Sequence, residues 1–182
     1  NTDIDPATGL TPYNNMQKVL KVCHDFVDNF DNTFSNLLFI GQTGVGKTFL
    51  SNCIARALMD SCHSIIYLTA GEFFDSFKSD DFKEFGSSKF DTSFFVECDL
   101  LIIDDLGTEK ASDYNFSNLF NTINERLLRR KSIIISSNLE MPDIETRYSQ
   151  RIFSRLVSAY SILRLFGDDI RCMKKLSPTK RS

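Results

Sequence analysis

The sequence predicts an α/β fold in which a five-stranded parallel sheet is covered by helices on both faces. Short apolar runs alternate along the chain with longer segments in which apolar residues recur every three or four positions. The short runs are continuously apolar, which is typical of parallel strands buried on both faces of a sheet. With 182 residues, the chain is long enough for one such domain with a substantial core.

The expected elements follow one another in regular order. An amphipathic helix begins at Pro12 and continues to about Phe30. Strands are expected at residues 36–40, 65–68, 100–103, 133–135 and 162–166, and the remaining helices at 48–59, 72–77, 116–127 and 144–157. We expect a polar lead-in over residues 1–11, the α/β domain over 12–176 and a basic tail over 177–182. Such sheets bind ligands at the carboxyl ends of their strands.

Composition argues against several functional classes. A net charge of −3 disfavours a general nucleic-acid coat but leaves room for local basic patches. Two clusters are candidates, with solvated surface charge as the alternative for both: Arg126, Arg129, Arg130 and Lys131, and the tail residues Lys174, Lys175, Lys180 and Arg181. No apolar run is long enough for a membrane span and no export leader is present, so we expect a cytoplasmic protein. Because the chain starts at Asn1 rather than Met, an earlier region is expected to be missing.

Residues 41–48 read Gly-Gln-Thr-Gly-Val-Gly-Lys-Thr and match the P-loop pattern G-x-x-x-x-G-K-[ST]. The glycines let successive backbone N–H groups turn toward a phosphate, and the following helix presents its positive end to the same anion. Lys47 is expected to reach the outer phosphates and Thr48 to ligate Mg²⁺. The expected ATP- or ADP-binding residues are Gly41, Thr43, Gly44, Val45, Gly46, Lys47, Thr48 and Phe49. The alternative, a glycine-rich turn that only caps a helix, is disfavoured because the motif has an apolar strand before it and a helix after it.

Polar side chains also follow two later strands. Asp104 and Asp105 end the third strand, which is how P-loop enzymes place a metal-holding carboxylate beside the phosphates. We assign Asp104 to Mg²⁺ and Asp105 to the attacking water, as general base or orienting group. Asn138 ends the fourth strand and could hold that water or sense the γ-phosphate, although a helix cap or turn is the alternative.

Two arginines, Arg151 and Arg155, lie four positions apart on one expected helical face. Such a pair could meet the ATP of a neighbouring subunit as an arginine finger. Exposed arginines on a helix are more often solvated surface, and the sequence alone leaves both possibilities open.

Together these segments resemble the bacterial helicase-loader family of AAA+ proteins, the DnaC and DnaI type, with IstB as a close relative. The resemblance covers most of the chain and is carried by residues 41–48, 101–109, 133–138, 151–156 and 166–171. It implies that Asn138 is the sensor 1 residue, Arg155 the arginine finger with Arg151 beside it, and Arg171 the sensor 2 arginine. It also implies an AAA+ domain without a C-terminal lid. Asp105 departs from the glutamate of many AAA+ enzymes, and its shorter carboxylate predicts slow hydrolysis.

The loader family also has a helical insertion that helps to hold single-stranded DNA, and residues 71–99 match it. Aromatic and basic side chains in this stretch suit base stacking and phosphate contact, with the hydrophobic core as the alternative for the aromatic ones. They are Phe73, Phe74, Phe77, Lys78, Lys83 and Lys89.

The resemblance implies an ATPase that loads the replicative helicase, binds single-stranded DNA and self-associates through Arg155. Contact with the helicase would be made by the missing N-terminal region. Three alternatives remain open: an IstB-like transposition helper, a small-molecule P-loop kinase, and a non-hydrolysing switch in which Asp105 is too short to act.

Overall fold

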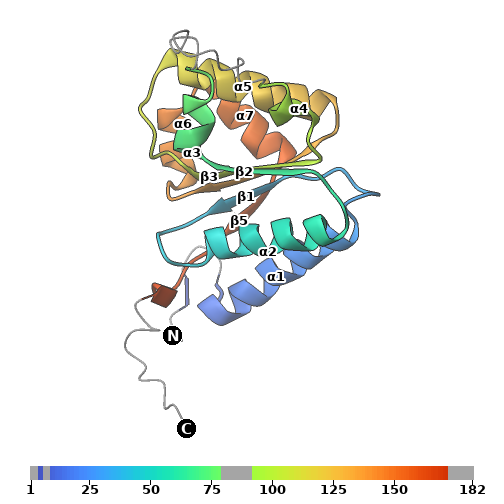
Figure 1. Ribbon diagram of the computed structural model, residues 1–182. Coiled ribbons are helices and arrows are strands. Elements are labelled where there is room, and N and C mark those ends of the chain that lie inside the picture. Colours follow the sequence, from blue (N-terminus) through green and yellow to red (C-terminus); the bar gives the residue numbers. More distant parts are fainter. Residues whose placement is uncertain (1–3, 6–8, 79–91, 172–182) are drawn as a thin grey trace.

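The computed structural model describes residues 4–5, 9–78 and 92–171 and contains a five-stranded sheet (Figure 1). All neighbouring strands are parallel, in the order β2-β3-β4-β1-β5. The strands are β1 (Leu37–Ile40), β2 (Ile65–Thr69), β3 (Leu100–Leu106), β4 (Ser132–Ser137) and β5 (Ser161–Arg164). Because β1 lies between β4 and β5, the loop that follows β1 lies beside the carboxyl ends of both.

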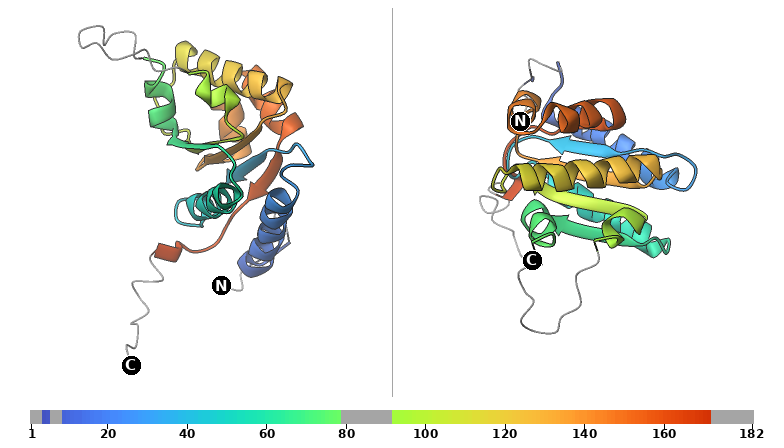
Figure 2. Two further views of the ribbon diagram at one scale, coloured as in Figure 1. Left: turned by 45° about the vertical axis from the view of Figure 1, so that its right-hand side comes forward. Right: turned by 90° about the horizontal axis from the view of Figure 1, so that it is seen from above.

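Helices cover both faces of this sheet, as Figures 1 and 2 show. On one face lie α1 (Pro12–Asp28) and α2 (Lys47–Asp60); on the other lie α3 (Ala70–Asp75), α4 (Phe94–Glu97), α5 (Asp113–Leu128), α6 (Met141–Arg147) and α7 (Gln150–Ala159). The predicted three-layer α/β/α fold with a five-stranded parallel sheet is therefore confirmed. None of the helices in the described ranges is both long and apolar enough to cross a membrane.

The three central strands, β1, β3 and β4, are buried on both sides because their successive side chains enter two separate cores. In β3, Leu100 and Ile102 pack with α1 and α2, whereas Leu101 and Ile103 pack with the helices of the opposite face. This alternation explains why the strands are continuously apolar in the sequence. It also places Asp104, the next residue of the first set, on the α1–α2 side.

Two expected elements differ from the structure. The predicted helix at 144–157 is two helices, α6 and α7, since Tyr148 has an extended backbone (φ −101°, ψ 162°). The side chain of Ser149 then accepts a hydrogen bond from the backbone N–H of Ile152 and caps the second helix. The third strand was expected to end at Ile103 but continues through both aspartates to Leu106.

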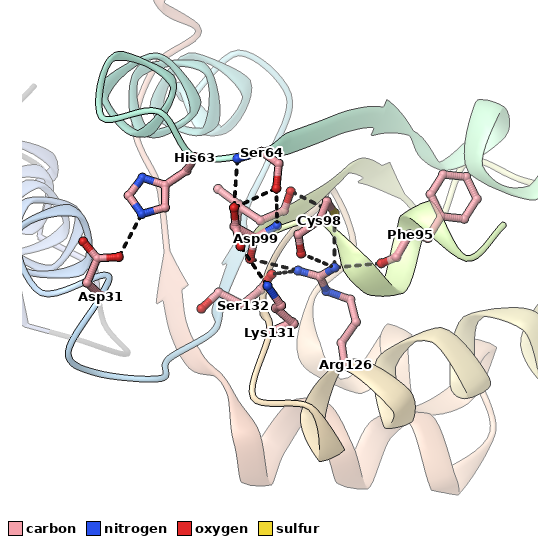
Figure 3. Close-up of polar contacts among 10 residues, drawn as sticks. Asp31, His63, Ser64, Phe95, Cys98, Asp99, Arg126, Lys131 and Ser132 are labelled. Atoms are coloured by element: carbon pink, nitrogen blue, oxygen red, sulfur yellow. Dashed lines mark hydrogen bonds and ion pairs between the residues drawn. The ribbon is translucent and has the colours of Figure 1, made fainter. Parts of the chain in front are cut away.

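Arg126 does not belong to a surface basic patch, so this part of the first predicted cluster is wrong. Its side chain is fully buried, and its guanidinium donates to carbonyl oxygens at the end of α4 and the start of β4 (Figure 3). The helix end and strand start leave carbonyls without a regular partner there, and a planar five-donor guanidinium can satisfy several of them at once. Arg129 and Arg130 are exposed, whereas the basic tail lies outside the described residues.

His63 lies just before β2, at the amino end of the strands, and contacts Asp31 (Figure 3). Its Nε2 lies 2.9 Å from Asp31 Oδ1 and its Nδ1 lies 3.2 Å from the Leu58 carbonyl oxygen. Both neighbours are acceptors, so only the doubly protonated ring can donate to both. The hydrogen bond that the His63 ring donates to Asp31 is the main cause that raises the pKa of His63 above its usual 6.5.

We therefore expect stability to depend on the charge of His63. A raised folded-state pKa means that the stabilisation is complete below the unfolded pKa and is lost as pH rises through the folded value. An NMR titration of the ring should give a pKa above 6.5 that falls in Asp31→Asn. The free energy of unfolding should decrease between about pH 6 and about pH 8 by more in the native chain than in His63→Gln. An identical pH dependence in the two would contradict the prediction.

Candidate functional site

The P-loop connects the end of β1 to the start of α2. Gly46 is the N-terminal cap of α2 and has a left-handed backbone (φ 107°), which a residue with a β-carbon adopts only with strain. At Gly41 (φ 139°) an added methyl group would collide with the carbonyl oxygen of Leu165, which follows β5. The glycines therefore let this loop turn tightly under the end of the neighbouring strand.

Lys47, the P-loop lysine, is buried and held by three oxygen acceptors. Its Nζ donates to the carbonyl oxygens of Gly41 at 2.6 Å and Gln42 at 2.8 Å, and to Asn138 Oδ1 at 2.6 Å. Burial is the main cause that lowers the pKa of Lys47, while the nearby Asp105 raises it. The ammonium is thus placed at the predicted phosphate position and joined directly to the end of β4.

Asp104 is a buried carboxylate with a donor on each oxygen. Tyr67 on β2 donates from its hydroxyl to Oδ2 at 2.8 Å, and Ser136 on β4 donates to Oδ1. Burial, followed by the contact with Asp104, raises the pKa of Tyr67, so its hydroxyl remains a donor at neutral pH. Among the described residues no lysine or arginine forms an ion pair with Asp104 within 4.0 Å. A buried oxygen donor that has no such partner fits a divalent cation such as Mg²⁺.

Asp105 reaches the same site because the strand is distorted at this point. In a regular strand, adjacent side chains point to opposite faces, so Asp104 and Asp105 would diverge. The pairing of β3 with β4 is irregular between Ile103 and Leu106, and Asp105 has a left-handed backbone (φ 56°). Irregularities of this kind re-aim side chains beside active sites. The Asp105 carboxylate as a result accepts a hydrogen bond from Asn138 Nδ2 at 3.3 Å.

Asn138 therefore connects the lysine to the second aspartate. Its Oδ1 accepts from Lys47 and its Nδ2 donates to Asp105. The same region is stabilised by Ser136, whose hydroxyl oxygen also accepts from the backbone N–H of Asp105 at 3.0 Å. The structure brings together the P-loop, the aspartate pair and Asn138 as the sequence predicted.

A cavity of about 810 Å³ opens over this cluster, within the size range of small-molecule sites. The predicted residues that line it are Thr43, Gly44, Gly46, Lys47, Thr48, Phe49, Asp105, Asn138 and Arg171. Gly41, Val45 and Asp104 are buried and are not among its lining residues. Five further lining residues were not predicted as site residues: Met16 and Leu20 of α1, Leu50 and Asn52 of α2, and Ile170. Met16 and Leu20 are partly buried. Apolar residues that recur every three or four positions predict the helix, but they do not show whether its apolar face packs in the core or lines a cavity.

Arg171 lies at this cavity on the segment after β5. The backbone N–H of Ile170 donates to the carbonyl oxygen of Gly44 at 3.1 Å, which ties that segment to the P-loop. The Arg171 side chain is 68% exposed and its Nε lies 3.5 Å from Asp169 Oδ1. The predicted sensor 2 arginine thus lies beside the cavity of its own chain.

Arg155 is not among the residues that line the cavity of its own chain. It lies on α7, and its NH2 group donates to Asn124 Oδ1 on α5 at 3.3 Å. Arg151 is exposed one turn earlier. The structure therefore does not bring either arginine to the site within one chain.

Glu109 links the loop after β3 to the junction between α6 and α7, a role that the sequence did not predict. Its carboxylate accepts from the backbone N–H of Gly107 at 2.8 Å, in the loop after β3, and from the Tyr148 hydroxyl at 2.5 Å. Arg147 Nε lies 3.6 Å from the same carboxylate. The loop that follows the two aspartates and the end of β3 is thereby attached to the junction between α6 and α7. A lone acidic residue in a loop gives no sequence signal of such a contact.

The predicted DNA-binding stretch is only partly described. Phe73 and Phe74 are fully buried and pack in the core, so their proposed role as base-stacking residues is wrong. The reason is that α3 is a short helix whose apolar face must be covered by α4 and the sheet. Lys78 is exposed and pairs with Asp75 at 2.7 Å, while Lys83 and Lys89 lie outside the described residues.

Fold and site together define an ATP-binding P-loop domain of the AAA+ class. The family model described as IstB-like ATP binding protein matches residues 14–177, and the chain belongs to that family. It is 23% identical over 151 residues to the replicative helicase loader DnaC of Escherichia coli K12, an alignment that covers 82% of this chain and 61% of that protein. The chain thus spans less than two thirds of this relative.

Solved structures agree on the fold. A crystal structure of the DnaC helicase loader superposes with a TM-score of 0.72 at 22% identity and covers 84% of this chain and 90% of that one. DnaA from Aquifex aeolicus with bound AMPPCP superposes with a TM-score of 0.74 at 20% identity, covering 95% of this chain and 55% of that one.

Proposed function

We propose that the chain binds ATP with Mg²⁺ and hydrolyses it slowly. The observation that carries the proposal is the contact series Lys47–Asn138–Asp105 at one wall of the cavity. It places a cation for the phosphates, a neutral amide and a candidate base within one hydrogen-bonded group, as phosphoryl transfer to water requires.

Each group has a distinct task in this proposal. The P-loop N–H groups and the start of α2 receive the phosphates, and Lys47 exchanges its carbonyl acceptors for phosphate oxygens. Asn138 orients the attacking water and Asp105 accepts its proton. Thr48 and Asp104 would hold Mg²⁺, which supplies positive charge beside the phosphates. Met16, Leu20 and Ile170 give the cavity an apolar wall that suits a purine base.

At the level of the cell we propose a loader of the replicative helicase that binds single-stranded DNA. Support comes from the similarity to the DnaC loader and from DnaA bound to AMPPCP and single-stranded DNA, a structure with a TM-score of 0.71 at 20% identity. Helix α7, which carries the exposed Arg151 and the partly buried Arg155, supports self-association in which Arg155 reaches a neighbour's ATP.

A transposition helper is the second candidate, because the matching family model is named after IstB. Its site chemistry would be the same, and only the client protein would differ. Co-purification of the full-length protein with the replicative helicase supports the loader, and co-purification with a transposase supports the helper. A small-molecule kinase would instead transfer phosphate from ATP to a metabolite.

Lys47→Ala tests the site directly. We expect ATP hydrolysis to fall by about 100-fold or more, the loss typical of removing one pre-oriented charge-stabilising donor, and ATP binding to weaken as well. Lys110→Ala makes the same substitution at an exposed lysine and should leave both unchanged. Turnover that survives in Lys47→Ala would refute the proposed site.

A further inference from the structure

A hydrogen-bonded chain connects the two predicted magnesium ligands through residues that have no assigned role. Asn52 Nδ2 donates to the Thr48 carbonyl oxygen at 2.8 Å and to the Tyr67 hydroxyl oxygen at 3.4 Å. That hydroxyl donates in turn to Asp104 Oδ2 at 2.8 Å. The series therefore runs from α2, the helix that follows the P-loop, through Tyr67 on β2 to Asp104 on β3.

Packing alone does not require the polar atoms of this series. Tyr67 packs against the core on the α1–α2 side, where a phenylalanine ring would serve equally well. Strand register pairs Tyr67 with Ile102 and places Thr69 beside Asp104, so the tyrosine ring reaches toward the carboxyl edge of the sheet to meet the carboxylate. Asn52 lines the nucleotide cavity and is otherwise one of several exposed side chains on α2.

The combined contacts fix the orientation of Asp104. Tyr67 occupies one position on Oδ2 and Ser136 one on Oδ1, while a carboxylate offers about four acceptor positions in all. Two donors on different oxygens prevent rotation of the carboxylate and still leave acceptor positions open. Partners of this kind set the orientation and affinity of metal ligands in proteins.

We propose that Tyr67 and Asn52 are positioning residues for the magnesium ion that accompanies the nucleotide. They hold the Asp104 carboxylate at a fixed place relative to the backbone of Thr48, so that this ligand is oriented to share an ion with the Thr48 hydroxyl. The inference rests on the proposed function of this site as an Mg²⁺–ATP site.

Binding measurements on Tyr67→Phe test the inference without relying on turnover. Affinity for ADP is measured in EDTA, and Mn²⁺ affinity of the ADP complex is measured by electron paramagnetic resonance. We expect Mn²⁺ affinity to fall by about 10- to 100-fold, the usual effect of losing a partner of a metal ligand, with ADP affinity in EDTA unchanged. Asn52→Ala should change Mn²⁺ affinity in the same direction but less, because it contacts Asp104 only through Tyr67.

Tyr160→Phe is the matched control. Tyr160 is buried, whereas Tyr67 is partly buried. The Tyr160 hydroxyl has no hydrogen-bond partner within the described part of the chain, so its removal should not alter Mn²⁺ affinity. Native-like Mn²⁺ affinity in Tyr67→Phe overturns the inference, as does an equal loss of ADP affinity in EDTA, which would indicate a packing role. If the native chain binds no ADP at all, the proposed function itself fails.

Discussion

Replacing Arg155 with alanine is expected to lower ATP turnover of the assembled protein by about 1000-fold while ATP affinity stays close to native. The reason is that Arg155 does not line the cavity of its own chain and is proposed to stabilise charge on a neighbour's γ-phosphate, a task worth about 10³-fold or more for arginine fingers. Steady-state ATP hydrolysis measured against protein concentration checks the prediction, since a shared site requires turnover per molecule to rise with concentration.

Mixing two inactive variants gives the sharper form of this experiment. Lys47→Ala has a defective site but still offers Arg155, whereas Arg155→Ala has an intact site and no finger. Their mixture should recover activity only if the arginine acts between subunits. Arg151→Ala, one turn earlier and exposed, shows whether the effect is specific to Arg155. Absence of recovery, or turnover per molecule that is independent of concentration, would contradict the shared site.

The largest expected loss of stability comes from Arg126→Met. The guanidinium donates to the carbonyl oxygens of Phe95 at 2.7 Å, Cys98 at 3.0 Å, Asp99 at 3.1 Å and Ser132 at 2.6 Å. Each buried acceptor left without a partner costs about 1–3 kcal/mol. Because water can reach some of them, we expect the free energy of unfolding to fall by about 3–5 kcal/mol. That corresponds to a decrease in Tm of roughly 6–20 °C for a chain of this size.

Thermal and denaturant unfolding of Arg126→Met, with Arg129→Met as control, checks this expectation. Arg129 lies just beyond the same helix, its side chain is 55% exposed, and its ion pair with Glu125 spans 3.7 Å. Its replacement should change stability by no more than about 0.5 kcal/mol. Similar losses in the two variants would show that the buried contacts of Arg126 contribute little.

The parts of the site that the sequence predicted are those that each have a local signal in the sequence. A phosphate needs several consecutive backbone N–H groups, so the loop at 41–48 is recognisable as a unit. Asp104 and Asn138 could be placed because each ends a continuously apolar strand, and parallel strands bring such ends to one edge of the sheet. The layers of the fold follow from the same alternation of apolar strands and amphipathic helices.

The remaining features depend on contacts between residues far apart in sequence. Tyr67 reads as an ordinary strand residue until the register of β2 against β3 is known. Arg126 is close in the sequence to other basic residues, which is typical of exposed charge. Its burial depends on the position of the carbonyl groups at the end of α4. The positive φ of Asp105 occurs where the pairing of β3 with β4 is irregular, and the apolar pattern of the sequence does not predict it.

The acceptors around Lys47 affect how the lysine can bind a phosphate. A buried ammonium without partners would be strongly destabilising, yet Gly41, Gln42 and Asn138 already meet its three donor positions. A phosphate therefore has to compete with these internal oxygens for the lysine. Because Asn138 accepts from the same ammonium and also donates to Asp105, a movement of Lys47 toward a phosphate is expected to shift the contact between Asn138 and Asp105 as well.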